Sequence, residues 1–332
     1  MKGHETFVHR GWRAALTALL MLTPRMAPAA AIEWVTVGDP GNLCDAETDG
    51  CYGSVASEFD ISRFEVTNAQ YAEFLNAVAA DDVAGLFDVR MGNDAIFGGI
   101  TRSGVSGSYG YAVKPGYADK PVVFVTFYDA LRFANWLHNG EPIGDQGPAT
   151  TEGGAYTISV AGIGANSIAR NPSASAFLPS ESEWHKAAYY AAGTGLYSEY
   201  PMATNTPSSC VLPVSDDGNA ANCWPATSPD GALTDVGAYA SSSSAAGTFD
   251  QGGNVKEWTE AVSFGSSRVL RGGSWFTTAG AFAATNREGR NPADSSDDIG
   301  FRVARTVPEP AAGAGLVAAA CLLALRRRGR GL

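Results

Sequence analysis

The sequence is poor in histidine and in basic residues. It has four histidines in 332 residues, and its 23 Lys and Arg against 34 Asp and Glu give a formal net charge of −11. Eight of the basic and two of the acidic residues lie at the two ends, 1–31 and 307–332, so residues 32–306 hold 15 basic and 32 acidic residues, a net charge near −17. Nucleic-acid binding depends on neutralising phosphates with Lys and Arg, so this balance argues against a nucleic-acid partner. It suits an exported protein and is compatible with calcium sites.

The sequence also lacks an apolar run of the roughly 20 residues that a membrane-spanning helix requires. The N-terminal run, Ala14–Leu22, follows several basic residues and precedes a stretch of small residues that ends at Ala31. A basic start, a short apolar core and an A-x-A ending are typical of a secretory signal peptide. We therefore predict a signal peptide at residues 1–31, cleaved after Ala29 or Ala31. A short membrane anchor is the alternative.

The C-terminus combines Val-Pro-Glu-Pro at 307–310, an uncharged run at Ala311–Leu325, and four arginines between Arg326 and Arg330. An apolar run followed by arginines is typical of a cytoplasmic stop signal. This layout resembles the PEP-CTERM sorting signal, which an exosortase recognises in Gram-negative bacteria that make extracellular polysaccharide. The resemblance implies that residues 307–332 are a sorting tail, held in the membrane through 311–325 until an exosortase processes it. An ordinary C-terminal anchor is the alternative, and both place the domain outside the cytoplasm.

Five cysteines are present, and one of them, Cys321, lies in the C-terminal run. The other four form two close pairs in the sequence, Cys44 with Cys51 and Cys210 with Cys223. In an oxidising compartment these pairs predict two disulfides, each closing a short loop. Metal binding by these cysteines is disfavoured because neither spacing is C-x-x-C and no histidines cluster nearby.

Periodicity predicts a mixture of helices and short strands. Apolar alternation predicts strands at Ile32–Val37, Phe59–Val66, Arg268–Arg271 and Ile299–Val303, and less clearly at Ala155–Val160. A 3.6-residue apolar period with Thr67, Thr126 and the capping box of Ser180 and Glu183 predicts helices at Asn68–Ala79, Phe127–His138 and Glu181–Ala192. The glycine-rich region Asp81–Tyr117 has no clear period, which predicts a long surface loop.

Six sequence blocks occur in an order that resembles the formylglycine-generating enzyme family, also called the sulfatase-modifying-factor domain. The blocks are FEVTNAQYAEFLNAV at Phe64–Val78, VTFYDALRFANWL at Val125–Leu137, LPSESEWHKAAYY at Leu178–Tyr190, GNVKEW at Gly253–Trp258, RGGSW at Arg271–Trp275 and GFRVAR at Gly300–Arg305. The resemblance implies an α+β, loop-rich variant of the C-type lectin fold over residues 32–306, with little regular secondary structure.

The resemblance also shows what chemistry is missing. Active members of the family bind copper(I) through two cysteines after RGGS and use oxygen to convert a substrate cysteine to formylglycine. Those two positions fall on Thr277 and Phe282, neither of which has the soft thiolate that Cu(I) prefers, so copper is not expected. Another branch makes sulfoxides with iron held by histidines, but residues 32–306 contain only His138 and His185. There is no G-x-S-x-G motif to indicate a serine hydrolase.

Oxygen ligands remain, and they favour calcium as a structural cofactor. The family places a calcium at GNVKEW, which here implies the carboxylates of Asp250 and Glu257 and the carbonyls of Gly253 and Val255. The alternative is that Glu257 pairs with an arginine. A second family calcium maps to Asn222, Cys223, Asp230 and Ala232.

The family's substrate groove maps to the surface around Trp275, Phe276, Arg287 and Arg290. Exposed aromatic rings beside arginines bind sugars, peptides or carboxylates. In the alternative, Trp275 is a core residue and the arginines pair with Asp294, Asp297 or Asp298. Three functions follow in order of preference: a non-catalytic module that binds a glycan or peptide at the cell surface or in the matrix, a calcium-stabilised structural protein, and an oxidase with altered ligands.

Overall fold

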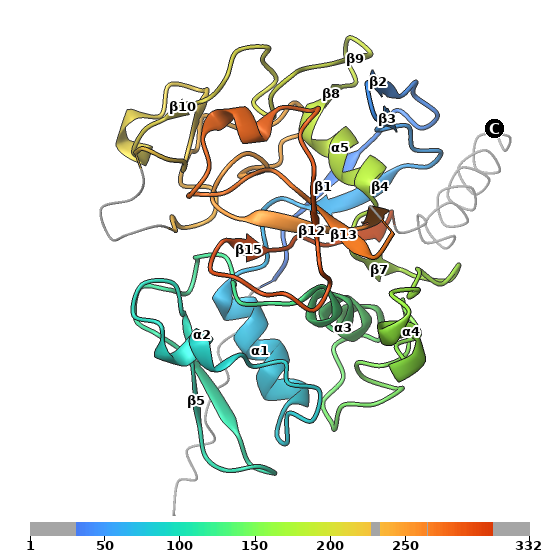
Figure 1. The fold of residues 1–332 in the computed structure, drawn as a ribbon, viewed down its shortest axis with the longest axis vertical. Helices are drawn as coiled ribbons and strands as arrows, with labels where there is room; N and C mark the ends of the chain where they lie inside the picture. The colour runs from blue at the N-terminus through green and yellow to red at the C-terminus, as the bar shows by residue number, and fades with distance from the viewer. Residues whose placement is uncertain (1–30, 227–232, 264, 308–332) are drawn as a thin grey trace, which may run out of the picture.

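The computed structural model describes residues 31–226, 233–263 and 265–307, and these residues form two four-stranded sheets with helices on either side (Figure 1). The first sheet has the order β1-β4-β16-β7. It joins the two ends of the domain, because the first strand of the domain, β1, and the last, β16, both pair with β4. Its strands are β1 (Trp34–Val37), β4 (Phe59–Ser62), β16 (Ala304–Thr306) and β7 (Ala176–Phe177).

The second sheet has the order β14-β13-β12-β15. Its strand β13 leads into the RGGSW block, where the candidate site lies. The central pair is antiparallel and β15 joins β12 in parallel. Its strands are β14 (Glu288–Arg290), β13 (Ser267–Arg271), β12 (Lys256–Ser263) and β15 (Ile299–Gly300). The smaller two-stranded pairs are β2 (Asp45–Glu47) with β3 (Gly50–Tyr52), β5 (Ile100–Ser103) with β6 (Gly110–Val113), β8 (Tyr190–Ala191) with β9 (Leu196–Tyr197), and β10 (Ser209–Cys210) with β11 (Ala220–Ala221).

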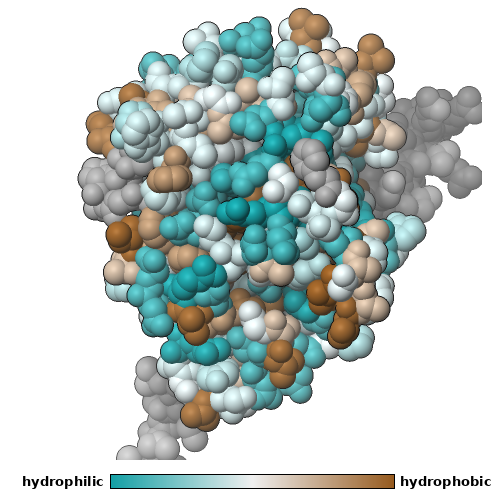
Figure 2. Space-filling view, in the orientation of Figure 1, coloured by the Kyte–Doolittle hydropathy of each residue, from teal (hydrophilic) through white to brown (hydrophobic). Residues whose placement is uncertain are grey.

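Three capping boxes start the three long helices, as the sequence predicts. Each N-cap hydroxyl accepts from the backbone N–H three residues on, and the side chain at that position accepts from the cap's own N–H. Figure 1 shows α1 and α3 on one side of the central strands and α5 on the other. In the same orientation, Figure 2 shows that hydrophilic residues predominate over the middle of this face. The helices are α1 (Asn68–Val78), α2 (Val89–Asn93), α3 (Phe127–His138), α4 (Val160–Gly164) and α5 (Glu181–Tyr189), with 3-10 turns at Pro213–Ser215 and Ala279–Phe282.

The largest core lies where α1 and α3 pack against the sheets. Tyr71 and Phe74 of α1 and Phe133 of α3 are fully buried, and all three rings contact each other. Phe301 packs on Phe133 with ring centroids 5.4 Å apart, so the GFRVAR block reaches this core. Burying four aromatic side chains contributes several kcal/mol of hydrophobic free energy, of the order of 2 kcal/mol each. The predicted apolar faces of both helices are therefore confirmed.

Several predicted boundaries are wrong. The region Asp81–Tyr117 is not one loop, since it holds α2 and the β5–β6 hairpin. The strand predicted at Ala155–Val160 is reduced to one bridge between Tyr156 and Arg170, because the hydroxyl of Ser159 accepts from Gly162 N–H and starts α4. Helix α5 stops at Tyr189, where the chain turns extended and enters β8.

The carboxyl of Asp129 in the second capping box gives α3 a pH-dependent stability. It accepts from Thr126 N–H at 2.9 Å and lies 3.9 Å from Arg132, yet burial raises its pKa from 3.8 to about 6. A folded-state pKa above the unfolded value means that this group's contribution to stability is full below about pH 3.8 and is lost as the pH rises through about 6. We predict that the free energy of unfolding of the wild type, minus that of Asp129→Asn, falls across this window. Urea unfolding at several pH values measures it, and parallel curves for the two proteins would contradict the prediction.

Candidate functional site

The RGGSW block forms a tight turn at the end of β13. Gly272 and Gly273 both have positive φ, 94° and 64°, which L side chains rarely adopt. A Cβ on Gly273 would lie 2.8 Å from the ring of Phe282 and from the hydroxyl of Thr277. The turn therefore brings the two positions that the family resemblance assigns to copper ligands against the same glycine.

Thr277 and Phe282 pack and hydrogen-bond as structural residues. The hydroxyl of Thr277 accepts from Ser274 N–H at 2.9 Å and donates to Ser274 O at 3.0 Å. Phe282 is fully buried in a cluster with Tyr200, Met202 and the cysteine Cys223. The cavity that remains beside Thr277 measures about 40 Å³, close to the volume of one water molecule. Neither of the two positions that the family resemblance assigns to copper ligands supplies a thiol.

An exposed aromatic surface lies next to this turn. Trp275 is half-buried, its ring stacked on Phe97 with centroids 4.9 Å apart, whereas Phe276 is 67% exposed. The side chain of Trp224 is 54% exposed, and its backbone N–H donates to Thr277 O at 3.0 Å, which places the backbone of Trp224 beside the same turn. We call Trp224, Trp275 and Phe276 the aromatic platform. The sequence predicts Trp275 and Phe276 as site residues but not Trp224, whose one sequence signal is its position directly after a disulfide cysteine.

Arg287 and Arg290 do not lie free beside the platform. Arg287 donates to both oxygens of Glu181, at 2.9 and 2.6 Å, and its guanidinium lies 5.1 Å from the centre of the Tyr52 ring. Arg290 lies 3.8 Å from Asp294. Arg287 therefore has an acidic partner that is not one of the three aspartates of the alternative, and Arg290 lies near one of those aspartates, Asp294, without a hydrogen bond to it.

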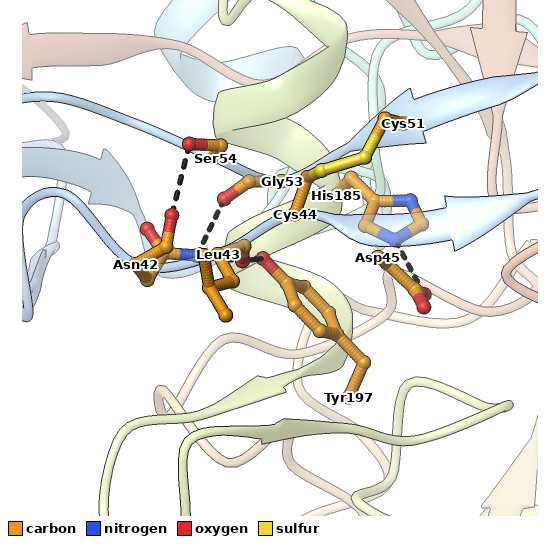
Figure 3. Close-up of a disulfide and its surroundings, with 9 residues drawn as sticks. All are labelled: Asn42, Leu43, Cys44, Asp45, Cys51, Gly53, Ser54, His185 and Tyr197. Atoms are coloured by element: carbon orange, nitrogen blue, oxygen red, sulfur yellow. Dashed lines mark hydrogen bonds and ion pairs between the residues drawn. A yellow bond between two sulfur atoms is a disulfide. The ribbon is translucent and has the colours of Figure 1, made fainter.

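A disulfide-closed hairpin packs against α5, with Asp45 beside His185 of that helix (Figure 3). Cys44 and Cys51 are bonded across β2 and β3, and Asp45 Oδ2 lies 3.1 Å from Nε2 of the buried His185. Burial lowers the pKa of His185 and favours the neutral imidazole. The second predicted disulfide, Cys210–Cys223, is also present. His138 contacts Ser175 at the end of α3, so in the described part of the chain the two histidines have separate partners and form no common site.

The first predicted calcium set surrounds a buried ion pair. Glu257 Oε2 and Oε1 accept from Arg302 at 2.6 and 2.8 Å, and Trp184 also donates to Glu257 at 2.7 Å. Asp250 accepts from Gly237 N–H at 2.6 Å, and burial raises its pKa to about 6. Glu257 therefore has the arginine partner that the alternative assigned to it.

The same region nevertheless carries excess negative charge. Glu65, Asp250 and Glu257 are buried and interact electrostatically with the single guanidinium of Arg302. Oε2 of Glu65 has no hydrogen-bond partner among the described residues, and burial, followed by the charge of Asp250, raises the pKa of Glu65. Within the described residues no three His, Cys, Asp or Glu side chains are grouped to hold a metal. A calcium here would therefore rely mainly on the carbonyls of Gly253 and Val255, a donor type that it accepts.

The second calcium set is only half visible. Asn222 donates to Asn254 Oδ1 at 3.2 Å, within the GNVKEW block. The next residue, Cys223, is bonded to Cys210 in the second disulfide. Asp230 and Ala232 lie outside the described residues, so this set stays a prediction.

Chelation tests both calcium predictions. We predict that EGTA lowers the melting temperature by several degrees, because an ion bound only to the folded state stabilises it by mass action. Adding excess Ca²⁺, but not Mg²⁺, is expected to restore the value, since Mg²⁺ requires near-octahedral geometry. Thermal unfolding followed by circular dichroism measures this, and an unchanged melting temperature in EGTA would remove calcium from the account.

The geometry defines a loop-rich α+β domain that has an aromatic surface beside a glycine turn and no thiol at that turn. Residues 48–307 match the model of the sulfatase-modifying factor enzyme 1-like domain, and the chain belongs to that family. The fold agrees with solved structures: CarF superposes with a TM-score of 0.50 and 24% identity over 84% of this chain and 99% of that one. Treponema denticola variable protein 1 gives 0.54 and 20% identity over 82% and 95%. The predicted fold, the formylglycine-generating-enzyme type of the C-type-lectin-like fold, is confirmed.

Relatives of known name differ in the activities that their names give. The chain is 26% identical over 269 residues to serine/threonine-protein kinase Pkn1 of Chlamydia trachomatis, covering 75% of this chain and 33% of that protein. It is 32% identical over 149 residues to the inactive C-alpha-formylglycine-generating enzyme 2 of Mus musculus, covering 40% and 44%. It is 25% identical over 292 residues to hercynine oxygenase of Mycolicibacterium thermoresistibile, covering 78% and 53%. The chain thus spans between a third and about half of the length of these relatives.

Proposed function

We propose that this protein is an exported, non-catalytic member of its family that binds a ligand at the cell surface or in the extracellular matrix. The observation that carries the proposal is the packing of Phe282. A fully buried ring fills the second of the two family cysteine positions, and the hydroxyl of Thr277 at the first is bonded to Ser274. Neither side chain supplies the thiolate that binds copper(I). A relative named as inactive shares the domain, which supports a role without that oxidation.

The aromatic platform is the proposed binding surface. Exposed large aromatic rings gathered in one place mark ligand sites on soluble proteins. Arg287 and Arg290 are paired with carboxylates, so recognition of an anionic group by these arginines is not favoured. Stacking on Phe276 and Trp224 then favours a neutral sugar face or an aromatic peptide side chain over a carboxylate ligand. Of these ligands, a glycan agrees best with the proposed sorting tail, because the bacteria that use such tails make extracellular polysaccharide.

Export and anchoring belong to the proposal as well. The signal peptide at 1–31 and the exosortase tail at 307–332 lie almost entirely outside the described residues, so their support is the sequence pattern. Two disulfides are consistent with an oxidising compartment. No helix among the described residues is long and apolar enough to cross a membrane.

Binding to glycan and peptide arrays tests the proposal, with platform variants as the readout. Phe276→Ala and Trp224→Ala are each expected to weaken binding by about fivefold, since stacking contributes of the order of 1 kcal/mol per ring. Leu196→Ala is the matched control, because Leu196 is an equally exposed apolar residue on β9. Equal binding by all three variants would argue against the platform. Absence of any ligand would favour the calcium-stabilised structural role.

A further inference from the structure

A cavity of about 320 Å³ lies at the start of the described domain, and no residue of the aromatic platform lines it. Ala31 and Ile32 form one part of its wall, and residues between Ser62 and Thr67 form another. Among the described residues that line this cavity, four carry carboxylates and none is a lysine or an arginine. We call it the N-terminal pocket. Its lining favours a cation as the occupant.

The carboxylates of the N-terminal pocket differ in how their charge is balanced. Glu33 lies 3.6 Å from a guanidinium and Asp235 lies 3.7 Å from a lysine ammonium, and the side chains of both acids are more than half exposed. Exposed pairs of this kind leave little charge uncompensated, because water screens them. Glu65 is different, since only 1% of it is exposed and its charge is out of reach of bulk water.

Glu65 lacks a full counter-ion among the described residues. Its Oε1 accepts from Asn254 at 3.2 Å, whereas its Oε2 is buried without a hydrogen-bond partner in that part of the chain. The guanidinium of Arg302 attracts Glu65 but is hydrogen-bonded to Glu257, at 2.6 and 2.8 Å. Burial, followed by the charges of Asp250 and Glu257, raises the pKa of Glu65. Three buried carboxylates thus share one guanidinium, and a second positive charge at the pocket would balance them better.

Strand pairing brings the backbone nitrogen of Ile32 to the same pocket. Strands β1 and β4 are antiparallel, and their register continues beyond both strands through the hydrogen bond from Arg63 N–H to Glu33 O at 2.8 Å. One residue further, this register puts Ile32 opposite Phe64, the neighbour of Glu65. Ile32 and Glu65 both line the pocket, so a charge created at the nitrogen of Ile32 would lie beside the unpartnered carboxylate.

Removal of the proposed signal peptide creates such a charge. Ala29 and Ala31 form the A-x-A pattern after which signal peptides are cleaved. Hydrolysis of the peptide bond between Ala31 and Ile32 consumes one water and yields a carboxylate on Ala31 and an ammonium on Ile32. An α-amino group has an ordinary pKa of about 7.7–8.0, so it is mostly charged at neutral pH. We infer that the α-ammonium of Ile32 occupies the N-terminal pocket and is the counter-ion of Glu65.

The ion pair would exist only after processing. In the precursor the nitrogen of Ile32 is an uncharged amide, so folding buries Glu65 without its counter-ion. Cleavage supplies the ammonium and stabilises the folded domain, because a buried carboxylate is costly until it is paired. The pair would therefore favour folding after export rather than before it. This inference rests on the proposed export and is independent of the ligand proposed for the aromatic platform.

The reactivity of the new amine tests the inference. The full chain is produced with its own signal peptide, exported and purified, and its N-terminal peptide is identified by mass spectrometry. We expect Ile32 to be the first residue. An acetylating N-hydroxysuccinimide ester at neutral pH is expected to modify the α-amine of the folded chain on the order of tenfold more slowly than that of the chain in urea. The reason is that a carboxylate partner raises the pKa of an amine by about one unit or more and so depletes the reactive neutral form.

Two variants identify the partner of the amine. Glu65→Gln keeps the shape of the side chain and is expected to bring the rate in the folded chain up to the rate in urea. Glu33→Gln is the matched control, because Glu33 lines the same pocket but is exposed, and this variant is expected to keep the protection. If Glu65→Gln does not fold, the comparison of folded and unfolded wild type still decides.

Each contrary result has a defined meaning. Equal rates in the folded and the unfolded wild type, or protection that survives in a folded Glu65→Gln variant, would overturn the inference and leave the proposed function untouched. A first residue of Ala30 would overturn it as well, since the ammonium would then lie two residues away. A purified chain that begins at Met1 would contradict both the inference and the proposed export.

Discussion

Replacing Arg302 with alanine is expected to lower the free energy of unfolding by about 3–5 kcal/mol, the usual cost of removing one partner of a buried ion pair. Arg302 and Glu257 are both fully buried and joined by two hydrogen bonds of 2.6 and 2.8 Å. The guanidinium also donates to Ser62 O and Phe249 O, so it ties the first sheet to the GNVKEW segment. Without it, Glu257 is left as a buried charge beside two further carboxylates.

Urea unfolding measures this loss, with Arg63→Ala as the matched control. Arg63 pairs with Glu33 at 3.6 Å on the surface, and an exposed pair contributes about 1 kcal/mol or less. The double variant Arg302→Ala with Glu257→Gln is expected to recover part of the stability, because the buried charge is removed as well. If Arg302→Ala destabilises no more than Arg63→Ala, the ion pair is not the support described here.

Phe282→Ala is expected to cost about 3–5 kcal/mol, the range for removing a buried Phe ring from a core. The ring packs against the cluster of Tyr200, Met202 and Cys223, and it fills the space left by Gly273. Truncation leaves a cavity between the RGGSW turn and the second disulfide. Phe282 therefore stabilises the turn at the second position that the family resemblance assigns to a copper ligand.

Phe276→Ala is the control for this prediction, since Phe276 is exposed six residues earlier in the same loop. It is expected to change stability by no more than about 0.5 kcal/mol, as surface substitutions usually do. Thermal unfolding of both variants provides the comparison. Equal losses would mean that the loop is packed differently from the arrangement described.

The elements that the sequence predicts well are those with local signals. The capping boxes at Thr67, Thr126 and Ser180 set the starts of the three long helices, and helix α3 has the predicted bounds. The two disulfides follow from short spacings that leave few alternatives. In each case, residues that are close together in the sequence are enough to predict the feature.

The features that the sequence does not predict depend on distant partners. Arg287 pairs with Glu181, 106 positions away, and Trp224 reaches Thr277 through a backbone hydrogen bond across the chain. Periodicity carries no information on such contacts. The sequence does not predict the β5–β6 hairpin, because glycines and serines obscure the alternation of its short strands. The candidate site is therefore predicted only in part: its turn and two of its three aromatic residues, but not the state of its arginines.

The measurement that tests the account most directly is an oxidation assay on the purified chain. The chain is incubated with Cu(I), oxygen and a sulfatase-type peptide that contains cysteine, and thiol-to-aldehyde conversion is followed by mass spectrometry, with a cysteine-containing family member as positive control. The account predicts no conversion, because Thr277 and Phe282 supply no thiolate to bind Cu(I). Copper-dependent formation of the aldehyde would contradict it and would require new ligands near Thr277.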